Sequence, residues 1–201
     1  MPVANFPSIE ANNIQVIPVT PLQISRTLSG RETRDLVTGP YFEFVYEYNS
    51  LTAAERRQVA GHIALANGAL NSFYVKLPTG LDDVSGEAAG TIDVTVGYSA
   101  SVTTVTYNAP SATSKTVFKA GDMIQFSNHG KIYEVTADSS TDGSGDGTLT
   151  FFPPLRTAIT TSHDINYNNV NALVRYKTDI SYEVRNSSFA SISLEFIEVF
   201  E

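Results

Sequence analysis

The acidic stretch Asp138–Gly147 comes closest to a metal-binding motif. It reads DSSTDGSGDG and places carboxylates at Asp138, Asp142 and Asp146. These residues occupy positions 1, 5 and 9 of a possible calcium loop, with glycine at position 6. The twelfth position, where such a loop needs a bidentate glutamate, is Leu149. The stretch therefore lacks the ligand that completes a calcium loop.

The surroundings of this stretch favour a turn. Its third position is Ser140, and no helical pattern flanks either side. Strand-like sequences, KIYEVTA before it and TLTFFPP after it, indicate a hairpin connection, in which glycine supplies positive φ and aspartate makes local hydrogen bonds. We expect an exposed tip on a β-barrel rather than a cation site.

The other residues with ligating or catalytic potential are scattered. His62, His129 and His163 show no metal-ligand spacing, so solvated or locally hydrogen-bonded imidazoles are expected. Asp82 and Asp83 are adjacent in a turn-rich connector, where solvated carboxylates are commoner than an acid–base pair. The chain has neither a G-x-S-x-G elbow nor a P-loop. We therefore predict no catalytic, cofactor-binding or metal-binding residues, and we expect that the protein is not an enzyme. A hydrolase that acts on cell-wall polymer would need a positioned acid and base, and no such pair can be nominated.

Composition narrows the class of protein. The chain has 201 residues, of which 42% are hydrophobic, so it can bury a core. Its net charge of -8 has the wrong sign for binding nucleic acid or an anionic membrane surface. It contains no cysteine, which excludes disulfides and thiolate chemistry. Without a membrane-spanning run or a signal-peptide pattern, we expect folding and assembly in a cytoplasm, with no stable membrane insertion.

The first 78 residues combine strands with one helix. Proline interrupts residues 1–40 in a way typical of edge strands and extended arms. The segment YFEFVYEY, residues 41–48, alternates aromatic and acidic residues and predicts a strand. A helix is expected over about 53–67, because Thr52 and Glu55 form a capping-box pattern and Gly68 follows. The segment SFYVKL then predicts a further strand.

A second β-series follows a glycine-rich connector. Five short strand patterns, from TIDVTV to TLTFFPPL, are typical of a small barrel or sandwich. The C-terminal segments ALVRYKTDISYEV and SISLEFIEVF are strand-like again. We predict a discontinuous host domain, residues 1–78 plus 164–201, with an inserted barrel at residues 79–163.

The 10 tyrosines and 11 phenylalanines leave two interpretations open. Aromatic residues on strands mostly pack across the sheet. Exposed tyrosines could instead stack on sugar rings or form subunit contacts. Packing across the sheet is the favoured interpretation.

Residues 118–162 carry a family resemblance. They read FKAGDMIQFSNHGKIYEVTADSS…GTLTFFPPLRTAITTS, an Ala-Gly-Asp turn, a His-containing turn before KIYEVTA, and an aromatic strand ending in Pro-Pro-Leu. This layout resembles the distal tail proteins of long-tailed bacteriophages, particularly the small kind of non-contractile coliphage tails. The similarity extends back through SFYVKLP and forward through NNVNALVRYKTD.

The resemblance implies a fold and a role. It implies a mostly β protein in which a tail-tube-related β-sandwich with one α-helix is interrupted by an inserted OB-fold-like β-barrel. It also implies a structural virion protein of the tail tip, six copies of which form a ring. The implied partners are the tail tube protein, the tail-tip hub or fibre protein, the tape-measure protein and DNA in transit through the lumen. A carbohydrate- or host-receptor-binding module is the alternative, and some of the excess Asp and Glu is expected to face the lumen.

Overall fold

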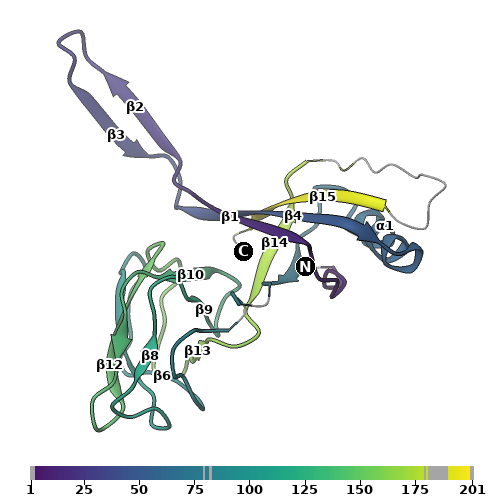
Figure 1. The fold of residues 1–201 in the computed structure, drawn as a ribbon. Coiled ribbons are helices and arrows are strands. Elements are labelled where there is room, and N and C mark those ends of the chain that lie inside the picture. Colours follow the sequence, from purple (N-terminus) through teal and green to yellow (C-terminus); the bar gives the residue numbers. More distant parts are fainter. Residues whose placement is uncertain (1–2, 79, 82, 179, 181–189, 200–201) are drawn as a thin grey trace.

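The computed structural model describes residues 3–78, 80–81, 83–178, 180 and 190–199. Its strands gather into two bodies, and a two-stranded hairpin projects away from both (Figure 1). The hairpin consists of β2 (Leu22–Arg26) and β3 (Glu32–Leu36). One helix, α1 (Ala53–Ala66), belongs to the first body.

The first body is built on a five-stranded antiparallel sheet in the order β1-β4-β15-β14-β5. Its strands are β1 (Asn13–Val19), β4 (Tyr41–Leu51), β5 (Phe73–Lys76), β14 (Asn171–Tyr176) and β15 (Ala190–Glu198). The alternation along β4 has the predicted effect, because Phe42, Phe44, Tyr46 and Tyr48 are all buried on one face. The packing interpretation of these aromatic residues is therefore confirmed.

The helix begins where the sequence predicted. The Glu55 amide donates to the Thr52 hydroxyl (3.3 Å) while the Thr52 amide donates to the Glu55 carboxylate (2.8 Å), so the capping box is confirmed. The helix ends at Asn67, which adopts a left-handed conformation with φ 53°, followed by Gly68 with φ 62°. Its buried side faces the core with Val59, His62 and Ala66.

The second body is a small barrel. A six-stranded sheet runs in the order β13-β9-β10-β12-β7-β6. It curls until its ends meet, because Asp93 and Asp164 form a bridge and the Ile165 amide donates to the Ile92 carbonyl (2.9 Å). The strands are β6 (Asp93–Val94), β7 (Thr104–Asn108), β9 (Met123–Phe126), β10 (Ile132–Val135), β12 (Asp146–Phe152) and β13 (Ile165–Asn166).

A short pair, β8 (Thr116–Phe118) with β11 (Ser139–Ser140), accompanies the barrel. The barrel has its own buried cluster, which includes Tyr107, Phe126 and Phe151. The predicted fold class, a mostly β protein combining a β-sandwich that carries a helix with a barrel, is confirmed.

A buried carboxylate joins the two bodies. Glu198, at the end of β15, accepts hydrogen bonds from the Phe42 amide (3.0 Å) and the Ile132 amide (2.9 Å). It also accepts one from the Lys131 ammonium, and neither charged side chain is more than 3% exposed. Burial lowers the pKa of Lys131, and the negative charge of Glu198 opposes that shift.

Apolar packing completes this joint. Met123 and Ile132 of the barrel belong to the buried cluster of the sheet body. Gly130 lies against Leu173 of β14 so closely that a Cβ there would come within 2.9 Å of the Leu173 Cβ. The absence of a side chain at Gly130 thus permits the close approach of barrel and sheet.

His62 is buried and His129 is half-buried, and both are hydrogen-bonded within the fold. His62 is only 5% exposed, and its ring nitrogens lie 2.9 Å from the Tyr176 hydroxyl and 3.0 Å from the Ala4 carbonyl. His129 Nε2 lies 2.7 Å from the Tyr133 hydroxyl, which accepts a bond from the Arg156 amide (3.0 Å). That hydroxyl therefore donates to a neutral imidazole. Burial, with smaller effects of Lys131 and His163, lowers the pKa of His129 to about 4.

Removing the joining carboxylate should destabilise the protein. The substitution Glu198→Ala leaves the Lys131 charge and two amides buried without their acceptor, so the free energy of unfolding should fall by about 3–5 kcal/mol. Urea unfolding measures the effect. Lys177→Met, which removes an exposed ion pair with Glu43, is the matched control and should cost less than about 1 kcal/mol. Equal losses in the two variants would contradict the assigned role of Glu198.

Acid should weaken the fold through His129. An unfolded imidazole has a pKa of about 6.5, so below that pH the unfolded state binds more protons than the folded state, in which His129 titrates at about 4. This contribution to stability is complete above pH 6.5 and is lost as the pH falls towards 4. The urea midpoint at pH 7.5 and 5.0 should differ less in His129→Gln than in the unaltered chain. An identical pH dependence in both would show that His129 does not contribute.

Candidate functional site

The hairpin of β2 and β3, called the arm below, is the most exposed ordered element. Every residue of β2 and all but the first of β3 are exposed. Leu22 pairs with Leu36 and Ile24 with Arg34, so these side chains share one face of the ribbon. The intervening pairs, Gln23 with Asp35 and Ser25 with Thr33, are polar and form the other face. The arm is therefore amphipathic.

The apolar face of the arm is open to solvent. Leu22, Ile24 and Leu36 are 46%, 54% and 60% exposed. Exposed apolar surface on a soluble domain commonly marks a contact surface. Towards the tip the same face carries charge, since the Glu32 carboxylate lies 2.9 Å from the Arg26 guanidinium and 2.6 Å from that of Arg34.

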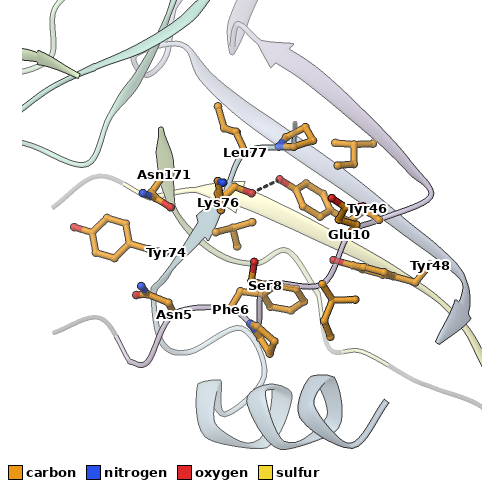
Figure 2. A pocket seen from close by; sticks show the side chains of 16 residues that line it. Asn5, Phe6, Ser8, Glu10, Tyr46, Tyr48, Tyr74, Lys76, Leu77 and Asn171 are labelled. Carbon is orange, nitrogen blue, oxygen red and sulfur yellow. Dashed lines mark hydrogen bonds between the residues drawn. The ribbon is translucent and has the colours of Figure 1, made fainter. Parts of the chain in front are cut away.

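A groove opens on the sheet body at the other end of β1. The N-terminal segment Asn5–Ala11, called the strap below, forms one wall, and the groove has a volume of about 690 Å³ (Figure 2). Tyr46, Tyr48 and Val75 line it from the sheet. Polar side chains at its mouth come from the strap and from the edge of the sheet: Asn5, Ser8, Glu10, Lys76 and Asn171.

The strap is anchored at several points. Its Phe6 ring lies among the rings of Tyr48, His62, Phe73 and Phe196, with centroid distances of 5.2–6.5 Å. The Phe6 amide donates to the Tyr74 carbonyl (2.9 Å). After Phe6, Ile9 and Ala11 are partly buried and pack against the same core from the wall of the groove.

Two tyrosine hydroxyls give the groove polar character. The Tyr46 hydroxyl donates to the Lys76 carbonyl at 3.2 Å (Figure 2). In the described part of the chain, the Tyr48 hydroxyl is the one buried side-chain polar atom without a hydrogen-bond partner. Burial raises the pKa of both phenols, so both remain protonated donors at neutral pH. The lining of the groove thus contains two protonated phenols, of which one is bonded to the Lys76 carbonyl and the other is buried.

The acidic stretch of the barrel forms a hairpin turn, as predicted. The Asp142 carboxylate accepts from the Ser144 amide (2.8 Å) and the Asp146 amide (3.0 Å), and Thr141 bridges to Gly147. These carboxylate bonds lower the pKa of Asp142. The flanking segment departs from a wholly exposed tip, because Ser139 pairs with β8 and is buried.

The structure disperses the other predicted residues. His62 lies in the sheet body and His129 beside the joint, while the His163 ring accepts from the Thr160 amide (2.9 Å) in an exposed turn. His62 was expected to be solvated or bonded locally, but its partners are distant in sequence and it is buried. Asp83 bridges to Asn168, and Asp82 lies outside the described residues.

The described residues contain neither a cluster of metal ligands nor a membrane-spanning helix. Among them, no group of three or more His, Cys, Asp or Glu side chains has the arrangement of a metal site. None of the helices formed by these residues has the length and apolar character needed to cross a bilayer.

Sequence reasoning anticipated an arm but not its contacts. Prolines within residues 1–40 indicated extended arms, yet the pairing of β2 with β3 was not predicted, because ETRDL has no apolar alternation. The groove could not be found at all, since it joins the strap to strands far away in sequence.

A known protein family matches part of the chain, whereas no curated protein matches it. Residues 83–170, which contain all six strands of the barrel, match the family model described as distal tail protein pb9, B domain. The matched segment includes the layout from which the resemblance to phage distal tail proteins was inferred. The match of residues 83–170 confirms the resemblance to phage distal tail proteins and supports a structural role in a phage tail.

Proposed function

We propose that this chain is a ring subunit at the distal end of a phage tail. Several copies, six by family resemblance, would close around the channel for DNA and the tape-measure protein. The ring would join the tail tube to the tail-tip hub or fibre. The observation that carries the proposal is the match of residues 83–170 to the B domain of a distal tail protein.

The arm supports assembly with further copies. It leaves the end of β1 and extends away from both bodies, so its apolar face is positioned to meet another molecule (Figure 1). An arm that contacts a different surface on the next copy makes a head-to-tail interaction, and such interactions generate rings when the rotation closes.

We propose that the chain is divided into two domains with different roles. Residues 1–78 and 164–201 would form the tail-tube-like ring domain, and residues 79–163 the inserted OB-fold-like barrel. The separate buried clusters of sheet and barrel support this division.

The outer face of the sheet is our candidate for the lumen wall. It carries Glu43, Glu47 and Glu195, opposite the buried aromatic face. Lys177 lies 2.8 Å from Glu43 and 3.9 Å from Glu195. Carboxylates at a channel wall would repel DNA phosphates and keep the passage free.

Location in the virion tests the proposal directly. Tails decorated with an antibody against this chain should carry label at the junction of tube and tip in electron micrographs. Label along the whole tube, or none on tails that contain the chain, would overturn the proposed place.

The arm should be needed for assembly but not for folding. Replacing residues 22–36 with a short Gly-Asn linker removes only exposed side chains and one half-buried glutamate, so the thermal unfolding midpoint should change little. Light scattering should show that the unaltered chain forms oligomers at high concentration and the armless chain does not. Oligomers of equal mass in both would exclude the arm from the contact.

A further inference from the structure

We propose that the apolar face of the arm docks into the strap groove of a second copy of this chain. The inference rests on the proposed ring function and names the contact that would build the ring. Its partner surface is the space between the strap and strands β4 and β5.

The apolar face of the arm needs a partner surface that buries it. An isolated two-stranded hairpin is at best marginally stable in water, because it buries too little apolar surface. Here Leu22, Ile24 and Leu36 lie side by side on one face and remain about half exposed. A surface that buries these three side chains would stabilise the ribbon and explain why one face alone is apolar.

The groove is suited to bury the apolar face of the arm. Its volume of about 690 Å³ is ample for several aliphatic side chains, and Val75, Leu77 and Ile14 contribute apolar lining. Tyr48 lines the same space, and its hydroxyl is buried without a hydrogen-bond partner in the described chain.

Geometry favours a second copy over the arm of the same chain. Ile14, at the start of β1, lines the groove, whereas the arm begins at Leu22, just beyond the end of β1 at Val19. A seven-residue strand separates the two by about 20 Å, and the arm projects beyond β1 on the side away from the N-terminal segment (Figure 1). Each copy therefore presents an arm at one end and a groove at the other.

Opposite charges on the arm and on the strap indicate one register for the docked arm. Arg34 faces Ile24 across the ribbon, and Glu10 is an exposed residue of the strap that lines the groove. Insertion of Ile24 would bring the Arg34 guanidinium to the strap. We assign Arg34 and Glu10 as an ion pair between copies, made in addition to the pair of Arg34 with Glu32 inside the arm (2.6 Å).

Cysteine pairs test the contact, because the chain has no cysteine of its own. Full-length Ile24→Cys is mixed with full-length Ser8→Cys and treated with a short bismaleimide, and a covalent dimer is expected. Ser25→Cys, whose side chain lies on the polar face of the arm, is the matched control and should give little dimer with the same partner. Equal yields for the two arm positions would overturn the proposed face.

Charge reversal gives a second test. Arg34→Glu should weaken self-association about fivefold, the size expected for a rim ion pair, and Glu10→Arg should do the same. The two together should restore the affinity, as measured by sedimentation equilibrium. Additive losses would overturn the ion pair.

The outcomes separate this inference from the ring proposal. Oligomers without a 24–8 cross-link would overturn groove docking and leave the ring standing. A chain that stays monomeric at millimolar concentration without a cross-link would also overturn docking, while labelled tails still decide the ring. A cross-link with restored affinity in the double variant supports both.

Discussion

The arrangement of the two bodies depends on one buried carboxylate. Glu198 collects two backbone amides and an ammonium from segments that lie far apart in the chain. Desolvated charge tolerates little displacement, because any movement leaves a donor or acceptor without its partner. The barrel is consequently held at a set angle to the sheet, and Gly130 allows the approach that this angle needs. If the sheet builds a ring, this joint determines where the barrel stands on it.

Tightly packed regions and regions without packing partners are separate in this chain. The joint, the aromatic cluster around Phe6 and the barrel core all exclude water. The arm has no comparable packing and exposes its apolar face. The strap lies between these extremes, since Phe6 anchors it while the neighbouring residues border a groove. This distribution fits a protein whose internal geometry is settled before assembly and whose contact surfaces are completed by neighbours.

Local patterns predicted the elements whose causes are local. The capping box located α1, and the alternation of aromatic and acidic residues located β4. Short strands such as β8 and β13 escaped prediction because two or three residues carry no period. The Asp138–Gly147 turn was recognised from its residue types, while the burial of Ser139 was not, because β8 covers it.

The contacts that connect the elements depend on pairs that no local pattern links. In β15, alternation from Leu194 and Phe196 does place Glu198 on the buried face. Nothing near Lys131 in the sequence indicates that its ammonium meets that carboxylate. His62 shares the buried helical face with Val59 and Ala66, yet its partners, Tyr176 and the Ala4 carbonyl, lie on other segments. The candidate site has the same character, since strap and sheet meet only in the folded chain.

The turn at Asp142 has a consequence for how such a protein can vary. Its conformation is set by bonds among its own residues, and the bridge between Thr141 and Gly147 holds its two ends together. Asp142, Gly143 and Ser144 are exposed. Because the entropic cost of a longer loop grows slowly once the ends are fixed, extra residues at this point would extend outward and leave the barrel closed. The segment that resembled a metal site is thus a position where foreign peptide can be displayed on the surface of the molecule.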